Sequence, residues 1–126
     1  MNAEQIRQME AGRELDTLVM EVVMGYTREE REFLPSQHWA WVKPDEKPTY
    51  LLPQFSRDMT AAWEVVEKVH SMGWFTDLCW RDDVIHGRIV WAMDFVTNAG
   101  KCVSADSESA PLAICRAALL AVMGES

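Results

Sequence analysis

Asp82, Asp83 and His86 are the residues whose types and spacing come closest to a chemical site in this 126-residue chain. Two carboxylates and an imidazole this close together could bind a divalent metal or transfer protons, as in a metal-dependent hydrolase. They lie in the turn-rich segment RDDVIHG between two predicted strands, where polar residues also gather for conformational reasons. The sequence contains no glycine-rich phosphate loop, GxSxG elbow or HExxH motif. We therefore expect no enzymatic activity, no metal and no other cofactor.

A second candidate site combines acidic and aromatic side chains over residues 29–41. The expected binding residues are Glu29, Glu30, Glu32, His38, Trp39 and Trp41, together with the hairpin acids Asp82 and Asp83. Aromatic side chains beside a histidine can stack on a nucleotide base, but on an edge strand they also pack against a helix. Both interpretations stay open for the two tryptophans. The acidic side chains would attract a partner with a basic surface.

Asp94 is unusual because its neighbours on the same face of a predicted strand are apolar, namely Val90, Ala92 and Val96. A buried carboxylate needs a partner or a raised pKa. Arg116 is the one charged side chain between residues 110 and 123. We therefore predict an inward ion pair between Asp94 and Arg116.

Three helices are predicted to position these residues. The first spans residues 4–24, with residues 1–9 prone to fraying; Gly25 ends it, and a capping box from Thr27 to Glu30 predicts one further helical turn. The second begins at Ser56 and ends at Gly73. Its expected buried stripe is Met59, Ala62, Trp63, Val66, Val69 and His70. The third spans residues 110–123 and has almost no polar face, which predicts burial against another helix or in a homodimer interface.

The predicted strands are HWAWV, WFTDLCW, RIVWAMDFV and KCVSA, and a proline-rich loop over residues 43–55 follows the first of them. The last three form an antiparallel meander. Both faces of RIVWAMDFV are mostly apolar, which predicts a central strand covered on both sides. The expected fold is α+β: a three-layer α/β/α sandwich around a small, mainly antiparallel sheet, made of the meander and a short edge strand.

Composition limits the class of protein further. The length predicts a single domain over residues 1–126, and 48% hydrophobic residues with six tryptophans predict a packed core. The formal net charge of −8 argues against direct binding to nucleic acid or to an anionic membrane. We expect reduced, buried thiols at Cys79, Cys102 and Cys115. With no apolar signal core and no stretch of roughly 20 apolar residues, we expect a soluble protein inside the cell that makes it.

Three blocks of sequence, GRELDTLVMEVVMG, SRDMTAAWEVVEKV and SAPLAICRAALLAV, occur in this order. Together they resemble the phage ABA sandwich domain family, small proteins encoded by bacteriophages and prophages. The resemblance implies an alpha-beta-alpha sandwich and a phage origin, and with it the cytoplasm of the bacterial host as the expected location. It implies no catalytic or ligand-binding residues.

The resulting hypothesis is a non-enzymatic phage accessory protein that binds and inhibits a host defence or regulatory protein, in the manner of an anti-CRISPR protein or a nucleic-acid mimic. The alternative is a sponge for a nucleotide signal, with an aromatic and arginine pocket or a dimer interface as the site. That alternative requires Arg57, Arg81, Arg88 or Arg116 to cluster. A hydrolase using Asp82, Asp83 and His86 is the third hypothesis, and a homodimer is compatible with all three.

Overall fold

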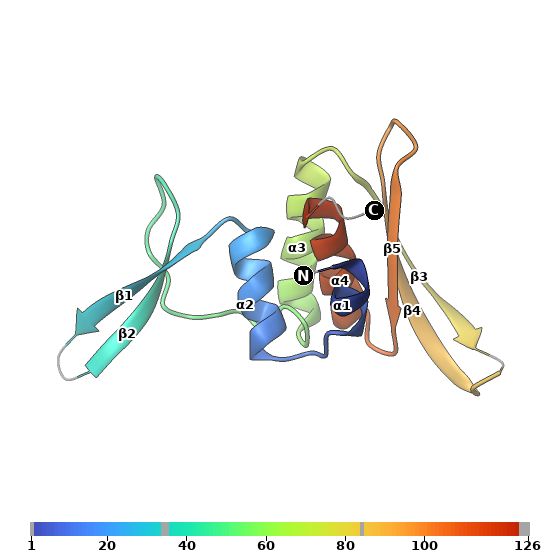
Figure 1. Cartoon of the computed structure of the whole chain (residues 1–126), viewed down its shortest axis with the longest axis horizontal. Helices are drawn as coiled ribbons and strands as arrows, with labels where there is room; N and C mark the ends of the chain where they lie inside the picture. The colour runs from blue at the N-terminus through green and yellow to red at the C-terminus, as the bar shows by residue number, and fades with distance from the viewer. Residues whose placement is uncertain (1, 34–35, 84, 124–126) are drawn as a thin grey trace.

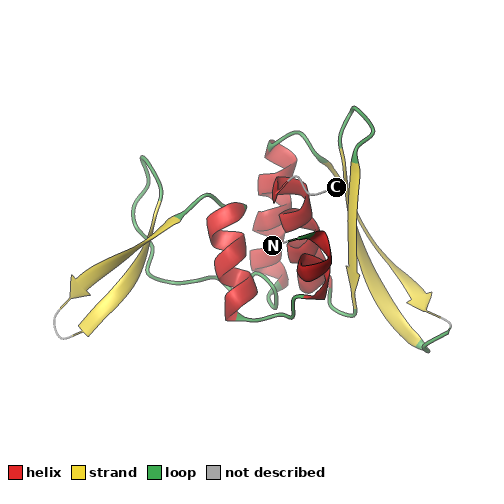
Figure 2. Cartoon of the chain, in the orientation of Figure 1, coloured by secondary structure: helices red, strands yellow, loops and turns green. Residues whose placement is uncertain are grey.

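A computed structural model describes residues 2–33, 36–83 and 85–123 and confirms the α+β class (Figures 1 and 2). Two antiparallel sheets are present in the described residues, with strand orders β1-β2 and β3-β4-β5. The elements are α1 (Ala3–Gln8), α2 (Arg13–Val22), β1 (Thr27–Phe33), β2 (Ser36–Val42), α3 (Met59–Ser71), β3 (Phe75–Asp83), β4 (Arg88–Val96), β5 (Cys102–Ser107) and α4 (Ala110–Met123).

The helices lie between the two sheets, with the three-stranded meander on one side and the β1–β2 hairpin on the other (Figure 1). The meander itself is confirmed, with β4 at its centre. The expected edge strand is not part of this sheet, because β2 pairs with β1 instead. Within the described residues the helices cover one face of the meander rather than both, so its other face is open (Figure 1). Met93, Phe95, Val103 and Ala105 are the buried residues that face the helices.

Helix α4 lies at the centre of the packing, which explains its lack of a polar face. It contacts α1, α2, α3, β4 and β5. Every residue from Ala113 to Ala121 is buried except Arg116. Its five alanines leave room for neighbouring backbones to approach closely. Of the two explanations offered by the sequence, flanking helices account for this burial within a single chain.

The N-terminal segment differs from the predicted single helix. Residues 3–22 form two helices, and the first has a capping box in which Asn2 and Gln5 exchange backbone-to-side-chain hydrogen bonds of 2.8 and 2.9 Å. Ile6 is fully buried against the core. One buried isoleucine and a cap hold this short helix, and neither produces a periodic apolar pattern; the fraying of residues 1–9 stays a prediction.

The segment TREEREF is strand β1 and not the predicted helical turn. It pairs with β2 residue by residue, from Thr27 opposite Val42 to Phe33 opposite Ser36. Inter-strand hydrogen bonds satisfy the backbone groups that a capping box would otherwise satisfy. The capping-box interpretation was therefore wrong, whereas the strand predicted at HWAWV is confirmed.

Helix α3 begins at a different residue from the one predicted. Its N-cap is Asp58, whose side chain accepts a 3.1 Å hydrogen bond from the backbone N–H of Thr60. The buried residues are Ala61, Ala62, Val65, Val66 and Val69. Met59, Trp63 and His70 were expected on this face and are exposed instead, Trp63 by 47%. The glycine terminators are confirmed, since Gly25 and Gly73 have φ values of 80° and 99°.

The proline-rich segment over residues 43–55 contains no helix and no strand. Hydrogen bonds and one buried side chain attach it to the rest of the protein. Trp41 and Thr49 exchange backbone hydrogen bonds of 2.8 and 3.0 Å. The Tyr26 hydroxyl donates a 3.1 Å hydrogen bond to Glu46. Phe55 is buried in the core. None of the helices in the described part of the chain has the length and apolar character needed to span a bilayer.

Candidate functional site

The β1–β2 hairpin brings six of the predicted binding residues together. Its register places Glu29 opposite Ala40, and Glu30 opposite Trp39. Arg28 and Arg31 alternate with the glutamates along β1, so the strand has a nearly balanced charge. Trp41 is 3% exposed and belongs to the core at the base of the hairpin. The hairpin is therefore a mixed-charge arm anchored by a buried tryptophan. The six predicted binding residues that lie on the paired strands β1 and β2 are Glu29, Glu30, Glu32, His38, Trp39 and Trp41.

Asp82, Asp83 and His86 lie at the far end of the molecule from this arm (Figure 1). Asp82 pairs with Ile89 and Asp83 with Arg88 at the end of the β3–β4 hairpin. Among the residues that the structure describes, no three His, Cys, Asp or Glu side chains gather as a metal-binding group. The two sets of acidic residues therefore do not form one continuous surface.

The predicted ion pair between Asp94 and Arg116 is not formed. Asp94 lies on the opposite face of β4 from Met93 and Phe95, which are fully buried beneath the helices. Arg116 lies on α4, on the helical side of the sheet, so the sheet separates the two charges. The prediction was wrong because it required Asp94 to point into a second helical layer.

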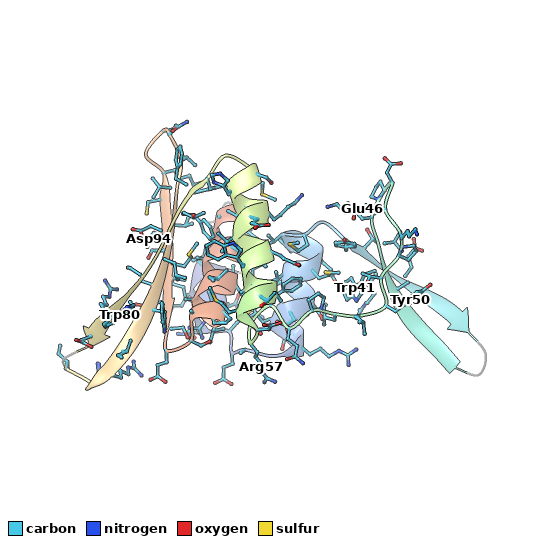
Figure 3. All side chains as sticks on the ribbon, turned by 180° about the vertical axis from the view of Figure 1, so that it is seen from behind. Trp41, Glu46, Tyr50, Arg57, Trp80 and Asp94 are labelled. Atoms are coloured by element: carbon cyan, nitrogen blue, oxygen red, sulfur yellow. The ribbon has the colours of Figure 1, made fainter. Side chains whose placement is uncertain are left out.

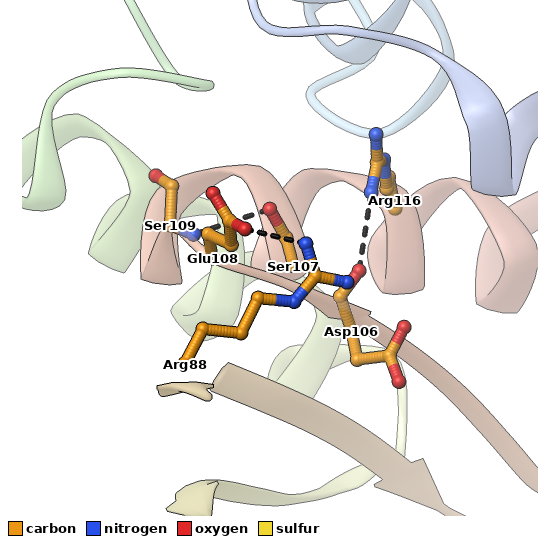
Figure 4. A network of polar contacts seen from close by, with 6 residues as sticks. All are labelled: Arg88, Asp106, Ser107, Glu108, Ser109 and Arg116. Atoms are coloured by element: carbon orange, nitrogen blue, oxygen red, sulfur yellow. Dashed lines mark hydrogen bonds and ion pairs between the residues drawn. The ribbon is translucent and has the colours of Figure 1, made fainter. Parts of the chain in front are cut away.

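Arg116 instead joins three segments through backbone carbonyls. Its Nε and Nη2 donate hydrogen bonds of 2.8 and 2.6 Å to the carbonyl oxygen of Met9, and its Nη1 donates one of 3.1 Å to that of Asp106 (Figure 4). Burial lowers the pKa of the Arg116 guanidinium, while Asp106 and Glu10 oppose this shift. The residue is therefore a structural clamp between α4, β5 and the segment after α1.

The open face of the meander carries several aspartates that come together from three strands. The cross-strand partners Asp77 and Asp94 lie side by side on it, with Ser104 next to Asp94 on β5. Asp106 lies on the same face and forms an exposed 3.6 Å salt bridge with Arg81. We call these five residues, Asp77, Asp94, Ser104, Asp106 and Arg81, the acidic outer face. The buried Val90 and Ala92 form its floor.

A pocket of about 460 Å³ lies between α2, the base of the β1–β2 hairpin and the segment after Thr49. Its lining includes three arginines and two aromatic residues, with Asp16 as its one acidic residue. We call it the arginine pocket. Trp41, Tyr50 and Arg57 mark its position in Figure 3. The residues that line it are Arg13, Asp16, Thr17, Arg28, Trp41, Tyr50, Leu51, Leu52, Gln54 and Arg57.

A buried polar cluster fixes one wall of the arginine pocket. Asp16 is 3% exposed, and its Oδ1 accepts hydrogen bonds of 2.8 Å from the Ser56 N–H and 2.7 Å from the Ser56 hydroxyl. The hydroxyl oxygen of Ser56 in turn accepts a 3.0 Å hydrogen bond from the N–H of Gly12. The cluster joins the N-terminus of α2 to the segment preceding α3.

Two of the arginines proposed as a nucleotide-binding cluster, Arg88 and Arg116, line a second hollow beside β5. There Arg88 forms an ion pair with Glu108, and Glu10 and Asp106 also line the hollow. Three acids therefore offset these two arginines. Arg81 pairs with Asp106, so of the four arginines named from the sequence only Arg57 lines the arginine pocket.

Sequence reasoning did not identify Asp16 as a buried residue or as part of a site. A signal was present, because Asp16 shares the spacing i, i+3, i+4 and i+7 with the buried Val19, Met20 and Val23. Arg13, Arg28 and Asp77 were also missed. No local pattern could have found them, because their neighbours come from distant parts of the chain.

The cysteines correct a further prediction. All three thiols are free, but only Cys115 is buried, whereas Cys79 and Cys102 are exposed on the open face of the meander. Burial raises the pKa of the Cys115 thiol far above its usual value. The two exposed thiols lie on the outer strands of the sheet and face solvent.

Comparison with known proteins identifies the family. The family model described as the phage ABA sandwich domain matches residues 17–119, which is most of the chain. No curated protein and no solved structure gives a significant match. The matched region includes α3, the meander and most of α2 and α4. The chain belongs to the phage ABA sandwich domain family.

Proposed function

We propose that this small phage protein acts without catalysis, by binding a host or phage protein through the acidic outer face. The observation that carries the proposal is the side-by-side placement of Asp77 and Asp94 on a sheet face that no described helix covers. Like charges directly opposite each other on neighbouring strands destabilise a sheet. A cationic partner would offset this cost, which makes the arrangement favourable in a complex.

The charge on this face also defines the partner. Three aspartates and one arginine leave it negative, in a chain whose formal net charge is −8. A second copy docking through the same face would bring aspartates against aspartates, so a basic surface is the better match. A host defence or regulatory protein with a basic groove is a partner of this kind.

The test is capture of a partner from host lysate by the wild-type protein and by the double variant Asp77→Asn/Asp94→Asn. The expected result is one specific partner that the wild type retains at low salt and releases as salt rises, because charge complementarity is screened. The double variant should lose it.

The matched control is Glu67→Gln, which removes a carboxylate from the exposed side of α3. It should retain the partner as the wild type does. Equal retention of a partner by all three proteins would show that the acidic outer face is not the binding surface. Retention that does not change with salt concentration would show the same.

A further inference from the structure

We propose that the arginine pocket is a binding site for a free nucleotide, with Arg13, Arg28 and Arg57 holding the phosphates and Tyr50 stacking on the base. This site is separate from the acidic outer face, which lies across the helices on the far side of the meander (Figures 1 and 3). The proposal rests on charge, aromatic lining, preorganisation and size.

Charge in the arginine pocket runs against that of the whole chain. The chain carries 20 acidic residues against 12 Lys and Arg, yet the pocket lining has three arginines and one acid. That acid, Asp16, is buried and already accepts two hydrogen bonds from Ser56. The pocket is therefore a local region of positive charge, which favours an anion. Arginine is suited to phosphate because its planar guanidinium can donate two parallel hydrogen bonds.

The three arginines converge from separate elements. Arg13 begins α2, Arg28 lies on β1, and Arg57 precedes α3. Arg57 Nη2 donates a 3.3 Å hydrogen bond to the carbonyl oxygen of Ala11, beside the N-terminus of α2. A guanidinium has five N–H donors, so this contact orients the side chain and uses one of them.

The aromatic lining distinguishes this pocket from a site for a simple anion. Trp41 lines the pocket and is itself buried, and the guanidinium carbon of Arg28 lies 6.0 Å from the centroid of its ring. Tyr50 is 49% exposed and supplies a ring on which a planar base can stack. Leu51 and Leu52 add apolar surface to the lining. A ligand with both a planar ring and a phosphate therefore fits this lining better than either part alone.

Two sets of hydrogen bonds within the protein hold the chain around the pocket in place. The hydrogen bonds among Gly12, Asp16 and Ser56 fix the chain next to Arg13 and next to Arg57. The bridge between Trp41 and Thr49 fixes the chain immediately before Tyr50. A preorganised site loses less conformational entropy on binding, which raises affinity.

Size limits the ligand. The volume of about 460 Å³ lies within the usual range of roughly 300–1,000 Å³ for small-molecule sites. A long polynucleotide would extend beyond the pocket over a chain of net charge −8 and be repelled. The favoured occupant is a free mononucleotide rather than a nucleic-acid strand.

The experiment is isothermal titration with ADP, and with adenosine, inorganic phosphate and a short oligothymidylate as comparison probes. Saturable ADP binding is expected, with adenosine and phosphate each binding at least tenfold more weakly. Arg13→Gln and Arg57→Gln should each weaken ADP binding about tenfold or more, since a charge-assisted hydrogen bond contributes this much. Tyr50→Leu should weaken ADP binding but leave phosphate binding unchanged.

Arg7→Gln is the matched control, because Arg7 is an exposed arginine on α1 outside the arginine pocket. It should bind ADP as the wild type does, and so should Asp77→Asn/Asp94→Asn, which separates this test from that of the acidic outer face. Circular dichroism establishes that each variant is folded; Arg13 and Arg57 are both exposed, so either variant serves if the other unfolds. Absence of saturable ADP binding, unchanged binding by a folded arginine variant, or tighter binding of oligothymidylate than of ADP would overturn the proposal.

Discussion

Replacing Arg116 with methionine tests the claim that this residue is a structural clamp rather than half of an ion pair with Asp94. Methionine keeps most of the aliphatic length of the side chain and removes the guanidinium. The substitution abolishes the hydrogen bonds of 2.8, 2.6 and 3.1 Å that Arg116 donates to the carbonyl oxygens of Met9 and Asp106. These bonds hold the segment after α1 and the end of β5 against α4.

The expected loss follows from counting acceptors. A hydrogen bond from a charged donor contributes about 1.5–3 kcal/mol, and Arg116 serves two carbonyl oxygens. Because the side chain is only half-buried, the lower half of that range applies, giving a loss of about 3 kcal/mol in the free energy of unfolding. For a domain of this size, each kcal/mol lowers the melting temperature by about 4 °C, so a decrease of about 12 °C is expected.

Urea unfolding and thermal melting measure the loss, and hydrogen exchange locates it. The amides of α1 should lose protection first, because the carbonyl of Met9 is the link that Arg116 holds. Arg116→Lys keeps the charge but lacks the planar fork, and we expect it to lose about half as much stability. Arg7→Gln, on the exposed side of α1, should change stability by less than about 0.5 kcal/mol. A loss below about 1 kcal/mol for the methionine variant, or full rescue by lysine, would refute the clamp.

Asp16→Ala removes the acceptor for both Ser56 hydrogen bonds, and a loss of about 2–4 kcal/mol in urea unfolding is expected from the buried donors left behind. Asp94→Asn should instead stabilise the protein by about 0.5 kcal/mol in the same assay, because it removes a like-charge cross-strand pair. Titration of the native protein with a thiol reagent should label Cys79 and Cys102 quickly, while buried Cys115 reacts only after unfolding; fast labelling of all three would contradict its burial.

The sequence was most informative where one apolar face is buried along a whole element. The meander, α4 and the position of α3 could be predicted because their apolar residues repeat with the period of a strand or a helix. The turn glycines were equally clear, since Gly25 and Gly73 adopt positive φ values of 80° and 99° that other residues rarely reach.

Prediction was weakest where distant segments decide the local structure. Segment TREEREF has no apolar alternation, and only its pairing with β2 makes it a strand. The same limit applies to the candidate sites. Asp77 lies 17 positions before Asp94, and Arg13 lies 44 before Arg57, so neither the acidic outer face nor the arginine pocket leaves a local motif.

The open face of β4 explains both why Asp94 and Arg116 form no ion pair and why the acidic outer face exists. Asp94 looked buried because its neighbours Val90 and Ala92 are apolar, and both are indeed buried. No described helix covers that face, however, because β4 is the central strand of a sheet with one open face. An aspartate in that position remains hydrated at its carboxylate and needs no internal partner. The negative charge of Asp94 is thus available to another molecule, and it favours a partner with a basic surface.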